Sequence, residues 1–214
     1  MSRKPKPSFQ PAPAEKVRPV FALVCTALLA AISFVLFSFE FPLFAAVPHL
    51  MMDFSDVPAL LGSLLLGPTT GVIVELLKNF LEFLTKGFSK QLGFGNIMNF
   101  AVGVGYLLPY TLVFRVGRKR HPGNQPRWQR VAAASAAGLL GILLLGLGMN
   151  YIFTPLYFRF VLETEITPDM IRASVGYATL LNGIKGGVLT AVAVPMLRLC
   201  RQLRKLMVRP GRRG

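Results

Sequence analysis

The chain has 214 residues, of which 53% are hydrophobic and 15% are charged, and its mean hydropathy is +0.53. A soluble domain is about 45–50% apolar and about 25% charged, so both values indicate a membrane protein and exclude a disordered chain. The formal net charge is +15, but the long apolar runs argue against a soluble nucleic-acid-binding protein. Two cysteines in a chain of this length cannot form a disulfide scaffold.

Six apolar segments follow a basic, proline-rich tail at residues 1–19, which we expect to be flexible. About 20 helical residues span the roughly 30 Å of hydrocarbon in a bilayer. The first segment is longer than the apolar core of a signal peptide, so we interpret it as a retained membrane helix. The second is too short to cross alone at about 1.5 Å per residue. The predicted helices occupy residues 20–39, 57–66, 69–84, 94–114, 131–160 and 170–199.

Most of the 24 basic residues gather in three places: the tail 1–19, the segment 115–130 and the C-terminal stretch that begins at Arg198. With six crossings all three fall on one side of the membrane, and the positive-inside rule makes that side the cytoplasm. The sequence therefore predicts an all-α bundle of six transmembrane helices in the plasma membrane, with both termini in the cytoplasm. We expect a membrane domain at 20–200 and a basic cytoplasmic tail at 201–214.

Charged residues occur in and before the third segment. A charge at the bilayer centre costs at least about 2.5–3.5 kcal/mol on insertion scales, so each one needs a partner or a function. Glu75, Lys78 and Glu82 are spaced by three and four residues and share one helical face. We interpret them as a paired cluster that joins this helix to its neighbours, with direct substrate contact as the alternative. Asp53 and Asp56 precede the second segment, and we expect them to cap that helix.

Amide side chains are unusually frequent in the later apolar segments. Asn182 and Lys185 lie three residues apart in a glycine-rich stretch, where a ligand can approach closely. We interpret this face as a ligand wall, although an amide can also join two helices. Asn96, Asn99 and Asn150 add further groups that both donate and accept hydrogen bonds. This pattern favours a small molecule with many hydroxyl and carbonyl groups.

Small residues line the first segment at helical spacing. Ala27 and Ala31 form one pair, and Ala22, Thr26 and Ala30 form a second stripe. Small residues let helices approach closely in lipid, either within this chain or against a partner. The sequence contains no GxxxxGK[ST], HExxH or GxSxG motif and no cysteine and histidine set at metal spacing. We therefore expect no enzyme, no metal site and no cofactor.

Three sequence segments resemble those of a known family: DFSDVPALLGSLLLGPTTGVIVELLKN at 53–79, GFGNIMNFAVGVGYLLP at 93–109 and NGIKG at 182–186. Over roughly residues 20–200 the chain resembles the RibU-type riboflavin-binding S components of energy-coupling factor (ECF) transporters. The resemblance implies six helices with cytoplasmic termini and capture of riboflavin near the extracellular side. It also implies that the energy for transport comes from a transmembrane coupling subunit and two ATPase subunits.

The resemblance further implies roles for individual residues. Ala27 and Ala31 match the small pair that packs on the coupling subunit. The family often has a glutamate where this chain has Asn96, so no carboxylate contact is expected at that position. Another vitamin, a flavin nucleotide, or a membrane scaffold without a small-molecule site remain alternatives. The residues that match flavin contacts are Asn150, Asn182 and Lys185, together with the backbone of His49, Leu50 and Met51.

Overall fold

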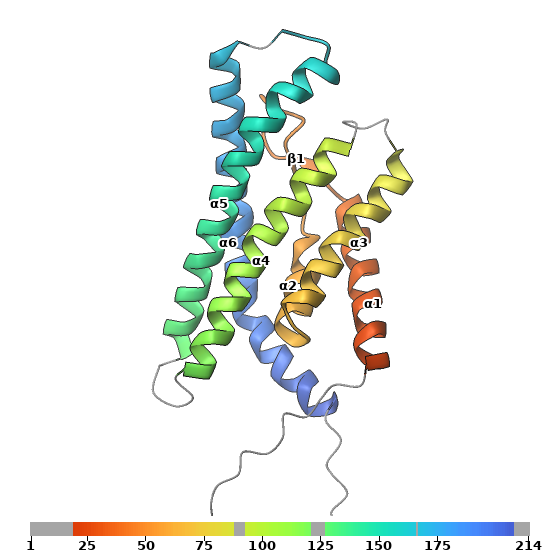
Figure 1. Cartoon of the computed structure of the whole chain (residues 1–214), viewed down its shortest axis with the longest axis vertical. Helices are drawn as coiled ribbons and strands as arrows, with labels where there is room; N and C mark the ends of the chain where they lie inside the picture. Colours follow the sequence, from red (N-terminus) through yellow and green to blue (C-terminus); the bar gives the residue numbers. More distant parts are fainter. Residues whose placement is uncertain (1–18, 88–92, 121–126, 166, 208–214) are drawn as a thin grey trace, which may run out of the picture.

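The computed structural model describes residues 19–87, 93–120, 127–165 and 167–207, and these ranges are almost entirely helical (Figure 1). The all-helical architecture that the sequence predicts is confirmed. The two tails lie largely outside the described residues. The helices are α1 (Pro19–Ser38), α2 (Asp56–Leu65), α3 (Pro68–Lys86), α4 (Phe94–Arg120), α5 (Arg127–Phe160) and α6 (Pro168–Met207), and the strands are β1 (Phe41–Pro42) and β2 (Met51–Met52).

Two helices continue beyond their predicted ends. α4 runs to Arg120 and α6 to Met207, whereas the apolar runs stop at residues 114 and 199. Arginine and lysine are good helix formers and are favourable near a helix C-terminus, so the basic residues extend the helices. The expected basic loop at 115–130 is therefore mostly helical, and residues 121–126 lie outside the described part of the chain.

Four helices are long and apolar enough to cross a membrane: Pro19–Ser38, Phe94–Gly117, Trp128–Phe160 and Pro168–Cys200. α3 has 19 residues but carries four charged side chains, and three of them are buried inside the bundle. α2 has only 10 residues, which at about 1.5 Å per residue reaches half of the hydrocarbon thickness. The described residues thus form six helices, of which four have the length and composition of a membrane span.

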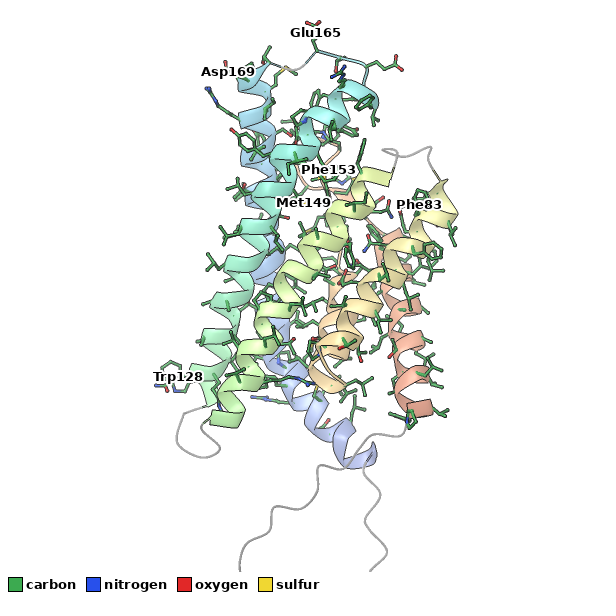
Figure 2. All side chains as sticks on the ribbon, viewed as in Figure 1. Phe83, Trp128, Met149, Phe153, Glu165 and Asp169 are labelled. Carbon is green, nitrogen blue, oxygen red and sulfur yellow. The ribbon has the colours of Figure 1, made fainter. Side chains whose placement is uncertain are left out.

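The helices form a bundle with two distinct ends. α4 packs along α5, α5 along α6, and α1 against α3, while the short α2 lies inside against α1, α3 and α6. The lower end in Figure 1 carries the start of α1, the end of α4, the start of α5 and the end of α6, so the described helix ends that border the three basic stretches lie together. Trp128 lies at this end, and the acidic Glu165 and Asp169 lie at the other (Figure 2).

The two stripes of small residues lie on different faces of α1. Thr26 and Ala30 are buried against the bundle, and farther along the same face so are Ser33 and Phe37. Ser33 Oγ donates to the backbone carbonyl of Ser55 at 2.8 Å, which ties α1 to the start of α2. Ala27 and Ala31 are exposed on the outer face, among large apolar side chains. The stripe of Thr26 and Ala30 thus serves internal packing, and the Ala27–Ala31 pair does not.

Candidate ligand-binding cavity

A cavity of about 130 Å³ opens in the upper half of the bundle, away from the basic ends of the helices. Its walls come from the ends of α1, α3 and α5, the start of α4, the middle of α6 and the segment between α1 and α2. All eight residues that the sequence suggests as ligand contacts line it. They are His49, Leu50, Met51, Asn96, Asn99, Asn150, Asn182 and Lys185.

The segment between α1 and α2 closes one side of this cavity. β1 and β2 pair antiparallel, with Phe41 opposite Met52. Leu50 and Met52 are buried, and they belong to a small apolar cluster with Ala178 and Leu181 of α6. His49 lies between α5 and α6: its ring is 5.0 Å from the Tyr157 ring, and its Nε2 is 3.3 Å from Ser174 Oγ. The segment is therefore anchored to both helices rather than projecting from the bundle.

Aromatic side chains form a second wall. Phe94 of α4 and Phe153 of α5 lie with their ring centroids 5.5 Å apart, and Phe153 is seen toward the upper end of the bundle in Figure 2. Phe153, Thr154 and Tyr157 follow Asn150 at helical spacing, and all four line the cavity. This spacing was a usable signal for Thr154, which the sequence reasoning missed. Phe37 and Glu40, at the end of α1, also line the cavity without any such signal.

Asn150, Asn182 and Lys185 are buried on the facing sides of α5 and α6. Gly146 of α5 makes room for Asn182: a Cβ atom at this position would lie 2.1 Å from Asn182 Nδ2. Its carbonyl also accepts a hydrogen bond from Asn150 Nδ2 at 2.7 Å. Because a carbonyl can only accept, this bond fixes the orientation of the Asn150 amide: its Nδ2 points to the backbone of its own helix, α5. One glycine thus sets the positions of two amides on different helices.

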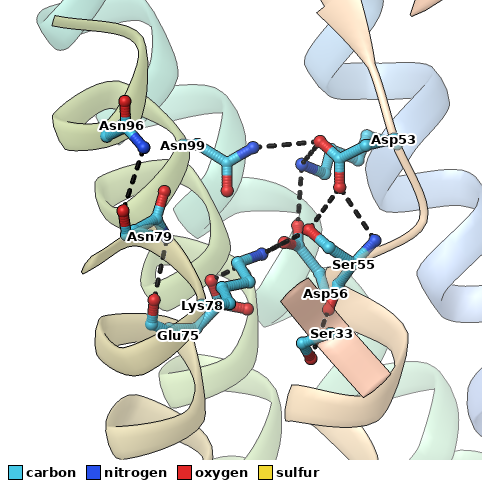
Figure 3. Close-up of polar contacts among 10 residues, drawn as sticks. Ser33, Asp53, Ser55, Asp56, Glu75, Lys78, Asn79, Asn96 and Asn99 are labelled. Carbon is cyan, nitrogen blue, oxygen red and sulfur yellow. Dashed lines mark hydrogen bonds and ion pairs between the residues drawn. The ribbon is translucent and has the colours of Figure 1, made fainter. Parts of the chain in front are cut away.

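A buried ionic network joins α3 and α6 to the start of α2 (Figure 3). Lys78 of α3 is fully buried; its Nζ pairs with Asp56 and lies 2.8 Å from Glu75 Oε2. Lys185 Nζ lies 3.1 Å from Asp53 Oδ2 and 3.0 Å from Asp56 Oδ2. Two ammonium groups therefore share three carboxylates, and the network holds the short α2 between its neighbours.

The expected capping of α2 is wrong for Asp56. The N-cap residue is Ser55, and its side chain makes no capping hydrogen bond to the first turn of the helix. Asp56 is the first helical residue, and its carboxylate is taken up by the two lysines. Asp53 accepts hydrogen bonds from the Ser55 backbone N–H at 2.8 Å and from the Ser55 hydroxyl, so it orders the turn before the helix. Ionic pairing takes precedence here because unpaired buried carboxylates cost more than an uncapped helix start.

Glu82 belongs to a second cluster rather than to the Glu75–Lys78 pair. Its two oxygens lie 2.5 Å from Lys86 Nζ and 2.7 Å from Asn96 Nδ2. Lys86 also pairs with Glu40 at 2.8 Å, so the cluster ties the ends of α1 and α3 to the start of α4. Glu75, Lys78 and Glu82 share one face of α3, but Glu82 contacts other partners than Glu75 and Lys78 do.

Two ionisable groups outside the helices have shifted pKa values. Burial alone would raise the pKa of Asp53, but the ammonium groups of Lys185 and Lys78 and the two hydrogen bonds from Ser55 lower it well below its usual range. Asp53 is therefore a carboxylate that only accepts. Burial lowers the pKa of His49, so its ring favours the neutral form.

Comparisons with known proteins agree with this architecture. A family model described as the substrate-specific component of ECF transporters matches residues 21–198. The chain is 31% identical over 180 residues to the riboflavin transporter FmnP of Bacillus subtilis (strain 168), covering 79% of this chain and 86% of that protein. It is 32% identical over 177 residues to the riboflavin transporter RibU of Staphylococcus aureus (strain TCH60), covering 82% and 88%.

A solved structure, described as the S component of a bacterial ECF transporter, superposes on the chain with a TM-score of 0.62 at 27% identity. The match covers 90% of this chain and all of the other. Together with the apolar helices, these matches identify a multi-pass membrane protein. The chain therefore belongs to the family of substrate-specific (S) components of ECF transporters.

Proposed function

We propose that this S component captures riboflavin in the cavity described above, for uptake driven by ATP hydrolysis in partner subunits. One observation carries the proposal: the same cavity is lined by aromatic side chains on one side and by buried amides and one lysine on another. Both relatives compared above carry the name riboflavin transporter, which supports the same ligand.

The chemistry of riboflavin fits these walls. Its tricyclic ring can lie against the faces of Phe94, Phe153 and Tyr157, which line one side. Its ring edge and its hydroxylated ribityl chain need donors and acceptors, and Asn150 and Asn182 supply both. Leaving such a group unpaired in a dry cavity costs about 1–3 kcal/mol, so the site would reject ligands that lack matching groups.

The charge distribution supports an orientation in the membrane. The basic ends of α4 and α6 and the basic start of α5 lie at the end of the bundle opposite the cavity, and basic segments are retained in the cytoplasm. We count six crossings: the four long helices and, between the first two of them, α2 and α3. An even number of crossings leaves both termini on the same side, the cytoplasm. The cavity then faces the extracellular side, where the vitamin is captured.

In this proposal partner subunits supply the energy, because the chain belongs to a family of substrate-specific components. The family resemblance supports a transmembrane coupling subunit and two ATPase subunits as these partners. Ala27 and Ala31 are exposed on α1 among large apolar side chains, and small residues at this spacing let another helix pack closely. This surface supports the assignment of α1 to contact with the coupling subunit.

Titration of the purified protein with riboflavin tests the proposal, with quenching of flavin fluorescence as the readout. Wild type should show saturable quenching. Lys185→Ala or Asn182→Ala should weaken binding at least about tenfold, since each removes a polar group from the cavity wall. Unchanged affinity in both variants would exclude these residues from the site, and no saturable quenching by wild type would exclude riboflavin as the ligand.

A further inference from the structure

One carboxylate in the cavity wall lies between two hydrogen-bond donors from different helices. Asp53 Oδ2 accepts from Asn99 Nδ2 of α4 at 3.0 Å and from Lys185 Nζ of α6 at 3.1 Å (Figure 3 shows the Asn99 bond). All three residues line the cavity, and Asp53 is only 2% exposed. The wall therefore presents a donor, an acceptor and a donor in a row.

The three groups retain capacity for a ligand. An amide nitrogen carries two hydrogens and an ammonium group three. Among the described residues, Asn99 Nδ2 donates to Asp53, and Lys185 is shared between Asp53 and Asp56, so each keeps one N–H. Because Lys185 has Asp56 as a second carboxylate, it can yield its place on Asp53 Oδ2 to a ligand N–H without losing its charge partner.

We propose that Asp53, flanked by Asn99 and Lys185, recognises an imide edge, in which one N–H lies between two carbonyl groups. The imide N–H donates to the carboxylate, and the two carbonyls accept from the flanking nitrogens. Resting on the proposed function, this edge is the pyrimidine-dione end of the riboflavin ring, whose N3–H lies between two carbonyls. Hydrogen bonds to an ionised acceptor are roughly twice as strong as neutral ones, so Asp53 determines specificity for this edge.

Methylation of the ligand at N3 tests the assignment, because it removes the donor and leaves both carbonyls in place. Wild type should bind 3-methylriboflavin at least about tenfold more weakly than riboflavin. In Asp53→Asn, which keeps the size of the side chain but removes its charge, riboflavin should bind more weakly and this gap should shrink to less than about threefold. A gap that persists in Asp53→Asn would reflect only the bulk of the methyl group and would overturn the assignment.

Glu75→Gln is the matched control. Glu75 is also a buried carboxyl group of the ionic network, but it pairs with Lys78 rather than with Lys185 and does not line the cavity. Its substitution should leave the preference for riboflavin over 3-methylriboflavin at the wild-type value, whatever its effect on stability. Equal loss of the preference in both variants would assign the effect to the ionic network and contradict a specific role for Asp53.

A measurement on wild type alone guards against variants that fail to fold. Riboflavin labelled with ¹⁵N at N3 should show, on binding, an imide proton signal shifted downfield and exchanging more slowly with water. An imide proton that exchanges as fast as in free riboflavin would overturn the assignment. Equal affinity for riboflavin and its 3-methyl derivative would overturn it too while leaving the proposed function intact, whereas absence of riboflavin binding would remove both.

Discussion

Gly146→Ala should weaken ligand binding without weakening the fold. The added methyl group would lie 2.1 Å from Asn182 Nδ2 and 3.0 Å from its Cγ, whereas ordinary van der Waals contact begins at 3.4 Å. The amide must therefore move by more than an ångström, away from the position in which it lines the cavity. Because the colliding atom ends a side chain, rotation of Asn182 relieves the contact, and the backbone carbonyl that holds Asn150 stays in place.

The expected magnitude follows from one misplaced amide. Losing its hydrogen bond to the ligand costs about 1–3 kcal/mol, which weakens binding about 5- to 150-fold. Alanine favours a helix interior over glycine by about 1 kcal/mol, so the thermal unfolding midpoint without ligand should stay the same or rise.

Riboflavin titration and thermal unfolding of wild type, Gly146→Ala and Gly148→Ala measure both effects. Gly148 lies in the same helix, and a Cβ there meets nothing within 4 Å, so Gly148→Ala should bind like wild type. The double variant Gly146→Ala with Asn182→Ala should bind no more weakly than Asn182→Ala alone. Wild-type affinity in Gly146→Ala, or equal losses in both glycine variants, would refute the reasoning.

Three further predictions concern the network, the closing segment and the outer face of α1. Lys78→Met should lower the free energy of unfolding by about 3–5 kcal/mol, because Glu75 loses its cation and Asp56 keeps only Lys185. Lys86→Met should cost at most about 1 kcal/mol, because the Lys86 side chain is partly exposed to solvent. Chemical denaturation compares the two variants. Burial lowers the pKa of His49 from 6.5, so as the pH falls the His49 imidazole is protonated in the unfolded chain before it is protonated in the folded one. The thermal unfolding midpoint should therefore drop between about pH 7.5 and 5.5. A drop of the same size in His49→Gln would show that His49 is not its cause. Trp at position 27 or 31 (Ala27→Trp, Ala31→Trp) should abolish riboflavin uptake in cells while the purified variants bind riboflavin like wild type, and normal uptake would exclude this face from the contact with the coupling subunit.

The helices were the most predictable part of the fold. Apolar runs of sufficient length specify α1, α4, α5 and α6, and the Gly67-Pro68 pair separates α2 from α3 because proline favours the first turn of a helix. Helix ends were less predictable where basic residues follow an apolar run, because hydropathy falls while helix propensity remains high.

Within the site, spacing along one helix was informative, and contacts between distant segments were not. The three-residue spacing of Asn182 and Lys185 correctly placed both on one face, and that face lines the cavity. Asn99 and Lys185 both contact Asp53, although they lie 46 and 132 positions away from it in the sequence. These contacts depend on how the segment between α1 and α2 folds back. No local pattern encodes that path. For the same reason, the shared face of Glu75 and Glu82 did not reveal that they have different partners.

The absorption spectrum of the protein purified from cells grown with riboflavin tests the central claim most directly, namely that the amides and the lysine of the cavity bind a flavin. Wild type should be yellow, with the flavin spectrum at about one flavin per chain, and Asn182→Ala with Lys185→Ala should lose most of the colour during the same washes. A colourless wild-type preparation that acquires no flavin when riboflavin is added back would contradict the account.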